Sequence, residues 1–318
     1  MFNYLKSLNI SWSSSEKLIQ ELAWRDYWQL AWNTKGDTIF RDLKHVQNPV
    51  SNYQISRAVV SANTGIIEID HAIERLFETG YMHNHMRMYV ASLCCNLAQS
   101  HWLKPSQWLY YHLLDGDLAS NSLSWQWVAG TNANKKYYAN QDNINKYFYS
   151  NQQNTFLDVS YENILNLDVP KVLTETTRLE LHTSLPQIEH PSLKSNQKTL
   201  IYNYYNLDPF WRKDEDAQRI LLLEPRLFDA YPVSNPCIEF VINLSKNISG
   251  IKIMVGSFEE LLERVDDHNI FYKEHPTNAH YKGNKDPRDW MTKETTSYQS
   301  FFAFWKHAKK ELKSKWQE

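Results

Sequence analysis

The residue types that could do chemistry concentrate between residues 64 and 127. They fall in three short stretches, which read TGYMHNHMRM at 79–88, DGDLASN at 115–121 and WQW at 125–127. On a helix, Asn84, Arg87 and Met88 are spaced i, i+3 and i+4, so they project from one face. This spacing brings an amide, a guanidinium and a thioether to one place.

The acidic stretch supplies the opposite charges. Asp117, Asn121 and Trp125 form a stripe at i, i+4 and i+8. Buried charges are usually paired, so Arg87 is expected to form an ion pair with Asp115. Taken alone, Asp-Gly-Asp also suits a turn or a metal site, and the histidines on either side of Asn84 could suggest a metal or nuclease motif. No further ligand set accompanies them, so we expect no metal.

The elements that must position these groups are helices. The first is predicted at 15–32, where a carboxylate and three indoles share one face: Glu21, Trp24, Trp28 and Trp32. Further helices are predicted at 66–78, 82–97, 105–114 and 118–128. Residues 131–154 are rich in Asn, Lys, Gln and Tyr, and we expect loops and short turns there.

The pattern changes in the second half of the chain. Prolines punctuate a polar stretch at 166–198, which we interpret as a linker. Predicted strands then alternate with helices, at 199–205, 219–223, 251–255 and 269–273, with a helix at 234–247. Ser257 and Glu260 have the spacing of a capping box. This alternation predicts a small parallel sheet, and a Lys-rich helix is predicted at 300–316. The expected fold is therefore a mainly α-helical domain followed by a small α/β parallel-sheet segment.

Composition excludes several classes of protein. Of 318 residues, 12 are Trp and only 8 are Gly, whereas Gly usually makes up about 7% of a chain. Collagen-like and low-complexity chains are therefore excluded, and 42% hydrophobic residues argue against disorder. Scarce Gly and the lack of a Gly-x-Gly-x-x-Gly motif argue against a Rossmann dinucleotide site.

Hydropathy, cysteine content and charge indicate the compartment of the protein and its attraction to nucleic acid. No stretch approaches the 18 consecutive apolar residues of a membrane span, and the first residues do not have the pattern of a signal peptide. The three cysteines, Cys94, Cys95 and Cys237, are read as free buried thiols in a reducing cytoplasm. The net charge of −2 gives no overall attraction to nucleic acid, so any DNA binding must depend on a local basic patch.

Taken together, these stretches resemble the flavin-binding helical domain of the DNA photolyase/cryptochrome family. That family carries a TGYMHNRxRM segment, a DGDLAxN segment and a WQW triplet in this order. Its E-x-x-WR-E/D-F/Y segment is similar to residues 21–27, which read ELAWRDY. The four motifs lie between residues 21 and 127 in the family's order with near-family separations, which argues against a chance match.

The resemblance implies FAD as the cofactor and assigns its contacts. It places Asn121 against the flavin N5, Asp115 and Asp117 beside the flavin ring and ribose, and Arg87 in the same network. Such a ring needs hydrogen-bonding groups near its nitrogens and a dry aromatic wall. The family positions around a flipped-out pyrimidine dimer correspond to five residues: Glu21, Trp24, Asn84, Met88 and Trp127.

The resemblance also implies an electron route. Trp125 and Trp102 match the inner two members of the family's tryptophan chain. The outermost member would fall within 47–53, where Tyr53 is a possible substitute. Light would excite the reduced flavin, an electron would pass to a cyclobutane pyrimidine dimer, the ring would split, and the electron would return. The dimer must leave the base stack to reach the flavin, and a damaged step stacks poorly.

The sequence departs from the family pattern at several points. Only 20 residues precede Glu21, so the segment that grips the flavin pyrophosphate is expected to be missing, with the hydroxyls of 11–15 as a possible replacement. His85 replaces an Arg, and Leu123-Ser124 replace paired glycines. The α/β segment lies after the helical domain, whereas the family's antenna domain precedes it. The sequence does not identify a second chromophore.

We therefore expect a photolyase-like flavoprotein, a deoxyribodipyrimidine photo-lyase acting on damaged DNA in the cytoplasm. The expected domains are 1–165 (helical), 166–198 (linker), 199–283 (small α/β) and 284–318 (C-terminal helix). One alternative is a cryptochrome-like light-sensing or redox flavoprotein without repair. The other is a binding or structural relative that has lost the cofactor together with its pyrophosphate grip.

Overall fold

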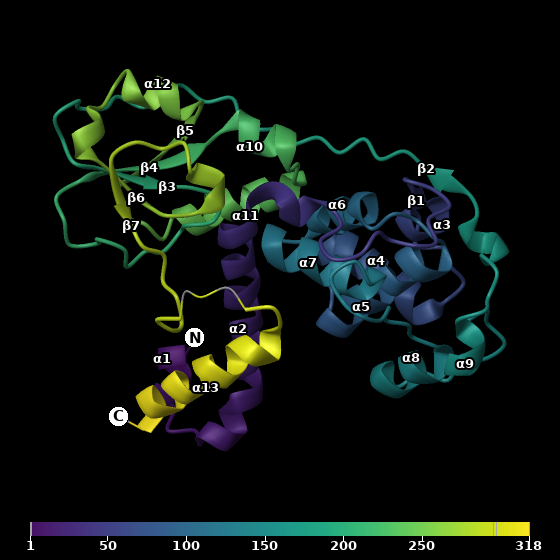
Figure 1. Ribbon diagram of the computed structural model, residues 1–318. Coiled ribbons are helices and arrows are strands. Elements are labelled where there is room, and N and C mark those ends of the chain that lie inside the picture. Colours follow the sequence, from purple (N-terminus) through teal and green to yellow (C-terminus); the bar gives the residue numbers. More distant parts are fainter. Residues whose placement is uncertain (1, 295, 297, 318) are drawn as a thin grey trace.

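The structure is a computed structural model that describes residues 2–294, 296 and 298–317. A helical half, residues 2–164, leads through an extended stretch to an α/β half, residues 199–317 (Figure 1). The α-helices of the first half are α1 (Phe2–Ser7), α2 (Trp12–Lys35), α3 (Arg57–Val60), α4 (Ile67–Thr79), α5 (Asn84–Ser92), α6 (Leu103–His112), α7 (Leu118–Ala129), α8 (Gln141–Phe148) and α9 (Tyr161–Ile164). The helices predicted there from periodicity are confirmed, with shifted ends.

The longest of these helices is α2, which extends beyond the predicted range at both ends. Ser11 caps it, because the Ser11 hydroxyl accepts a hydrogen bond from the backbone N–H of Ser14 at 3.2 Å. It ends at Gly36, whose φ of 56° suits a residue without a side chain. Trp28 and Trp32 are buried, whereas Glu21 is exposed. The helix face that was predicted to carry Glu21 and the three tryptophans is therefore only partly buried in the core.

Helix α5 starts two residues later than predicted, at Asn84. His83 precedes it as N-cap, with its ring nitrogen accepting from the backbone N–H of His85 at 3.3 Å. The helix continues as a turn of π-helix at Leu93–Leu97, whose side chains are all buried. Cys94 and Cys95 lie in this turn, and both are free buried thiols, as is Cys237.

The prediction of loops and turns throughout 131–154 is wrong. Helix α8 runs through Gln141–Phe148 and begins at Asn140, whose side chain accepts from the backbone N–H of Asn143. Ile144 is fully buried on its inner face. One buried apolar residue in a polar segment gives too weak a periodicity to predict a helix, because the asparagine cap and tertiary contacts stabilise it instead.

The α/β half is built on a five-stranded sheet with the order β5-β4-β3-β6-β7, and every pairing is parallel. Its strands are β3 (Thr199–Tyr202), β4 (Gln218–Leu223), β5 (Ile251–Val255), β6 (Ile270–Lys273) and β7 (Asn284–Asp286). Its helices are α10 (Pro225–Ala230), α11 (Asn235–Ser245), α12 (Phe258–Leu262) and α13 (Phe301–Gln317). The parallel sheet is confirmed; β7 and α10 were not predicted.

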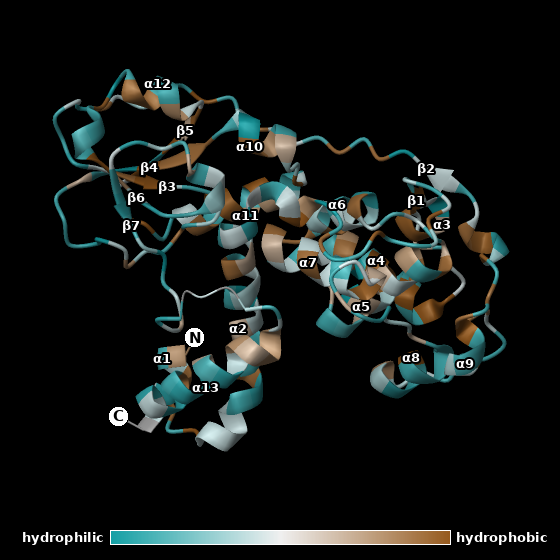
Figure 2. Ribbon diagram, in the orientation of Figure 1, coloured by the Kyte–Doolittle hydropathy of each residue, from teal (hydrophilic) through white to brown (hydrophobic). Residues whose placement is uncertain are grey.

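Both faces of this sheet are buried, as parallel sheets require. Leu200 and Tyr202 face a core shared with α11, whereas Ile201 faces a second core with Phe258 of α12. The hydropathy colours show the apolar strands β3 and β4 between their covering layers (Figure 2). The strand order reverses between β3 and β6, which makes this edge a topological switch point.

The two halves share one core. The face of the sheet that carries Leu200 packs in a cluster with α2, α7 and α13. Helix α13 crosses α2 (Figure 1), where the Phe301 ring stacks on the Trp24 ring with centroids 3.6 Å apart. Earlier in the chain, the short strands β1 (Ile55–Ser56) and β2 (Thr176–Thr177) pair antiparallel. No described helix is long and apolar enough to cross a membrane.

Candidate functional site

Arg87 and Asp115 form the predicted ion pair. One guanidinium nitrogen of Arg87, Nη2, donates to both carboxylate oxygens of Asp115 at 2.9 Å. The Arg87 Nε donates to the carbonyl of Met82 at 2.8 Å, which fixes the guanidinium against the turn before α5. The Asp115 side chain is 55% exposed, so solvent screening makes this pair a positioning contact more than a source of stability.

Asp117 starts helix α7. Its backbone is extended and its Oδ1 accepts from the backbone N–H of Ser120 at 2.8 Å, which makes it the N-cap residue. The other oxygen, Oδ2, accepts from Gln29 Nε2 at 2.5 Å and lies 3.6 Å from Arg25 Nε. Helix α2 therefore holds the buried carboxylate in place, and both of its oxygens are engaged.

Asn121 lies one turn further along α7 and keeps a free acceptor. Its Nδ2 donates to the carbonyl of Ser106 at 2.9 Å, and its Oδ1 accepts no hydrogen bond from a described residue. The neighbouring Ser120 Oγ is buried and has no partner within the described residues. We call Arg87, Asp115, Asp117 and Asn121 the α7 cluster. It combines cationic, anionic and amide groups with one unused acceptor, and the unpartnered Ser120 Oγ is next to it in the sequence.

The α/β half docks beside the α7 cluster. The hydroxyls of Tyr110 and Tyr205 are 2.7 Å apart, and burial raises the pKa of each well above its usual value. Both hydroxyls therefore stay protonated, and one donates to the other. The backbone N–H of Ser234, at the start of α11, donates to the carbonyl of Tyr111 at 2.8 Å. Tyr205 and Gln29 were not predicted from the sequence, because no motif around either residue indicates a contact between the helical half and the α/β half.

The two predicted electron-route tryptophans are buried, Trp102 at 0% and Trp125 at 2% exposure. Trp102 Nε1 donates to Asp42 Oδ1 at 2.7 Å. Tyr53 is exposed and stacks on the His101 ring, with centroids 5.3 Å apart, and that ring lies 5.8 Å from the Trp102 ring. Tyr53 therefore stands at the outer end of a short series of aromatic rings.

The five residues predicted to contact a lesion differ in their exposure, and the roles given to them stay predictions. Glu21 is exposed beside Lys17, Asn84 is exposed at the start of α5, and Trp127 is 37% exposed. Met88 is half-buried, and Trp24 is covered on one ring face by Phe301. Within the described residues, no hydrogen bond, ion pair or aromatic contact joins any two of the five.

The serine hydroxyls at 11–15, predicted as a possible replacement for the pyrophosphate grip, lie far from Asp117 along α2. Ser14 lies 15 residues before Gln29 on the same helix, so about 22 Å separates them along the axis. Ser11, Ser13 and Ser14 bond to one another around the start of α2. His83 and His85 stack with ring centroids 5.3 Å apart, and the described residues contain no group of three metal-binding side chains.

A cavity of about 260 Å³ lies next to the α7 cluster, between α2 and the sheet edge. It reaches the cluster through Gln29, but none of the four cluster residues lines it. A second cavity of about 450 Å³ lies on the far side of α6, beneath residues 177–181.

Comparison with known proteins identifies the helical half. Residues 18–162 match the family model described as the FAD binding domain of DNA photolyase. The deoxyribodipyrimidine photo-lyase of Synechococcus sp. is 38% identical over 121 residues, which are 37% of this chain and 25% of that protein. The enzyme of Streptomyces griseus is 33% identical over 117 residues, which are 36% of this chain and 26% of that protein.

A mitochondrial photo-lyase from Saccharomyces cerevisiae is 30% identical over 136 residues, 40% of this chain and 23% of that protein. The chain thus spans about a quarter of the length of these relatives. No solved structure matches it. The matched residues contain the α7 cluster and the segment with Glu21 and Trp24. By this match and these motifs, residues 18–162 are similar to the FAD binding domain of DNA photolyase.

Proposed function

We propose that this protein is a photolyase-like flavoprotein that binds FAD at the α7 cluster and transfers an electron to a cyclobutane pyrimidine dimer in DNA under light. The observation that carries the proposal is the α7 cluster itself, which brings Asp117 and the Arg87–Asp115 pair to the start of α7, the helix whose Asn121 has a free acceptor. The bound flavin would supply light absorption and one-electron chemistry.

Each cluster residue has a task that its contacts support. Asn121 Oδ1 is free to accept a hydrogen bond from a ring N–H, since its amide nitrogen is held by Ser106. Met82 and Asp115 fix the Arg87 guanidinium, and the Asp117 carboxylate is fixed at the N-cap of α7, so both charges are held in place. Trp125 and Trp102 are buried, so they can pass electrons to the flavin without contact with water.

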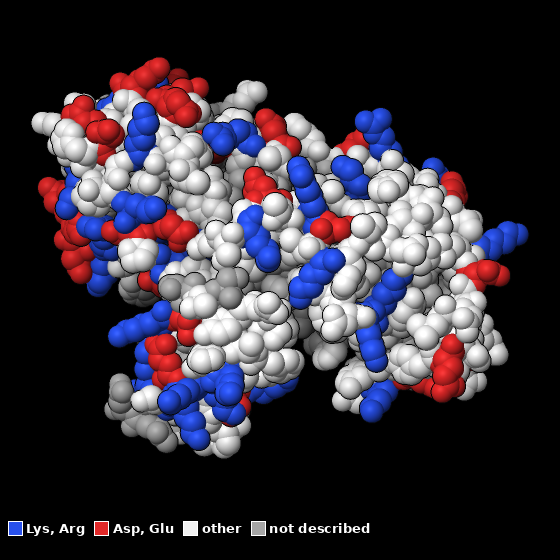
Figure 3. Space-filling model, in the orientation of Figure 1, with Lys and Arg blue, Asp and Glu red and all other residues white. Residues whose placement is uncertain are grey.

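The proposed partner is damaged DNA, which Glu21 and Asn84 would contact from their exposed positions. A flipped-out base needs aromatic walls, which Trp127 and Trp24 would supply. Phe301 covers one face of the Trp24 ring, so a base could stack on that face only after α13 shifts. Lysines gather over α13 in the space-filling view (Figure 3), and Lys306, Lys310 and Lys313 are exposed. This is the local basic patch that a near-neutral chain needs for phosphate contacts.

Two measurements on the purified protein test the proposal. The first is the visible absorption of bound flavin, which we expect in the wild type and expect to fall in Asn121→Ala. Asn166→Ala, at an exposed position outside the cluster, is the matched control. The second is light-dependent splitting of a pyrimidine dimer in a short oligonucleotide. A protein that binds no flavin after reconstitution refutes the proposal, and flavin without splitting limits it to the non-repair alternative.

The covered Trp24 ring favours that second candidate, a light-sensing or redox flavoprotein of the same family. There the α/β half and α13 would stay docked on α2, and light would change the state of the flavin without a DNA substrate. Phe301→Ala separates the two, because it uncovers Trp24. Dimer splitting that rises in this variant supports repair, and splitting absent from both proteins supports the alternative.

A further inference from the structure

The cavity next to the α7 cluster lies where ligands bind in open α/β sheets. Residues that follow β3, such as Asn203 and Asn206, form one side, and Lys273 to His275 at the end of β6 form another. The strand order reverses between these two strands, and ligands bind outside the carboxyl ends at such a point. Helix α2 closes the third side, so the site is also an interface between the two halves, a further preferred location.

One lining residue has an unused buried donor. Asn206 is 9% exposed, and its Nδ2 has no partner within the described residues. Its Oδ1 is occupied, because it accepts weakly from the backbone N–H of Asp208 at 3.5 Å. A buried amide N–H without an acceptor costs free energy, so an acceptor on a ligand is the natural partner for Asn206 Nδ2.

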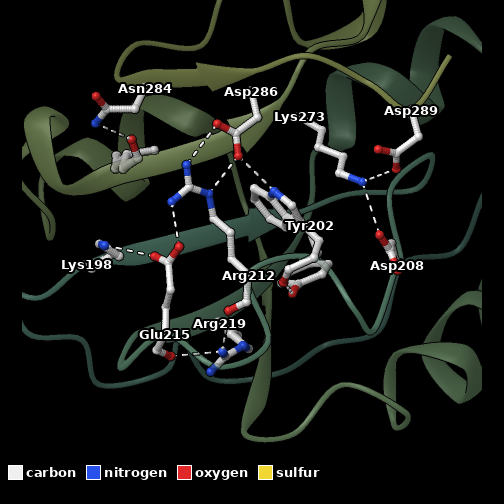
Figure 4. Close-up of polar contacts among 12 residues, drawn as sticks. Lys198, Tyr202, Asp208, Arg212, Glu215, Arg219, Lys273, Asn284, Asp286 and Asp289 are labelled. Atoms are coloured by element: carbon white, nitrogen blue, oxygen red, sulfur yellow. Dashed lines mark hydrogen bonds and ion pairs between the residues drawn. The ribbon is translucent and has the colours of Figure 1, made fainter.

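Among the cationic side chains that line the cavity, Arg25 keeps N–H donors that do not bind a carboxylate. Lys273 binds both Asp208 and Asp289 (Figure 4), and Arg288 binds Glu274 at 2.7 Å. Burial raises the pKa of the fourth lining carboxyl, that of Asp26, which favours its neutral form. Arg25 lies 3.6 Å from Asp117 through Nε only, so its terminal nitrogens remain open to an anion.

The walls suit a planar ring. The Tyr205 ring stacks on His275 with centroids 4.3 Å apart, and the Arg288 guanidinium lies over the ring of Trp290, which also lines the cavity. The volume of about 260 Å³ equals that of about eight or nine waters. It lies just below the roughly 300–1,000 Å³ of sites for drug-sized ligands, so a single nucleotide is the right size class and a dinucleotide is too large.

We propose that this cavity binds a nucleoside monophosphate, with the phosphate held by Arg25 and Asn206 and the base placed against Tyr205. The site goes beyond the proposed flavin function, because it is lined by none of the α7 cluster residues and needs no flavin to form. The chain lacks a glycine-rich phosphate loop; after β3 the turn is instead closed by Asn203, whose Oδ1 accepts from two backbone N–H groups. Side chains would therefore hold the phosphate.

Calorimetric titration of the full-length, flavin-free protein tests this site. AMP and thymidine monophosphate are the probes, with adenosine and inorganic phosphate as partial ligands. We expect one monophosphate to bind one-to-one, at least tenfold more tightly than either partial ligand. No measurable binding of either monophosphate overturns the proposal, and so does equal binding of inorganic phosphate, which would reveal an anion site without base recognition.

Two variants of Asn206 remove the donor. Asn206→Leu keeps the size, and Asn206→Asp keeps the acceptor for Asp208; each should weaken binding at least tenfold. Asn247→Leu, at an exposed position just beyond α11, is the matched control and should bind like the wild type. Unchanged affinity in both Asn206 variants overturns the assignment. Should either fail to fold, Arg25→Gln, whose side chain is 64% exposed, tests the phosphate contact independently.

One further titration separates this site from the flavin site. Where the purified protein carries flavin, we expect AMP to bind without releasing it. Displacement of the flavin by AMP, with loss of visible absorption, would show that the cavity belongs to the flavin's own adenylate and would overturn a separate site. The absence of flavin from the protein would refute the proposed function while leaving the AMP result interpretable.

Discussion

Gln29 joins the two halves of the molecule, so replacing it should reveal how strongly they are coupled. Its Nε2 donates to Asp117 in the helical half at 2.5 Å, and its Oε1 accepts from Arg288 Nη1 in the α/β half. The side chain is 5% exposed. Gln29→Leu keeps the size but removes both hydrogen bonds, and it leaves a buried carboxylate without one of its donors.

The expected cost follows from these contacts. Hydrogen bonds to charged groups contribute about 1.5–3 kcal/mol each, so the two together amount to about 3–6 kcal/mol. Burial of the leucine side chain offsets about 1–2 kcal/mol of this loss in unfolding free energy through the hydrophobic effect. The net loss is about 2–4 kcal/mol, which lowers Tm by about 4–8 °C at about 2 °C per kcal/mol for a chain of this size.

Scanning calorimetry is the suitable assay, because it also detects loss of cooperativity. We expect Gln29→Leu to melt earlier and with a broader transition, as the halves begin to unfold separately. Gln20→Leu, on the same helix but bonded only to Lys17 at 3.4 Å, is the matched control, with a change within about 0.5 kcal/mol. A folded Gln29→Leu protein with the Tm of the wild type would refute the reasoning that Gln29 couples Asp117 to Arg288.

Three further predictions follow from single contacts. Burial lowers the pKa of His112 to about 4, so its stabilising effect is complete above about pH 6.5 and is lost as the pH falls toward 4. His112→Phe should therefore flatten the dependence of unfolding free energy on pH in this window. Urea titrations would measure this change, which amounts to at most about 3 kcal/mol. Burial raises the pKa of Asp26, so its stabilising effect holds at low pH and is lost as the pH rises through the folded pKa. Asp26→Asn keeps the acceptor for the Met291 N–H. Relative to the wild type, this variant should therefore be more stable at pH 8 than it is at pH 4. Phe301→Ala should cost about 3–5 kcal/mol and expose Trp24, measurable as stronger acrylamide quenching of tryptophan fluorescence, and unchanged quenching would contradict the stacking.

The local features of the helical half were predictable because they depend on residues that are close together in the sequence. The periodicity of α4 and the cap of α7 are such features. Arg87 and Asp115 also pair as expected, although 28 positions of sequence separate them, because a part-buried guanidinium favours a carboxylate partner. Helix α8 was missed because its stability comes from Asn140 and one buried isoleucine, not from a repeating apolar face.

The contacts around the candidate site could not be predicted in the same way. Tyr205 reaches Tyr110 across 95 positions of sequence and Arg288 reaches Gln29 across 259. Neither pair has a motif, because long-range contacts arise from how the sheet packs on α2 and α7. The roles given to Glu21, Asn84, Met88 and Trp127 remain predictions, because residues that line a binding surface need not contact one another.

The position of Gln29 has a consequence for both proposed sites. Its two hydrogen bonds connect the N-cap of α7 with Arg288, a residue that lines the cavity at the switch point. A ligand that pulls Arg288 away from Gln29 frees the Gln29 side chain, and Asp117 Oδ2 then loses its shortest donor. The carboxylate beside the proposed flavin would change its surroundings although the ligand never touches it. Coupling of this kind is reciprocal, so flavin bound at the α7 cluster should change the affinity of the cavity for AMP by the same factor. Gln29→Leu should abolish that factor in both directions, because the chain contains no second described side chain that bonds to both Asp117 and Arg288.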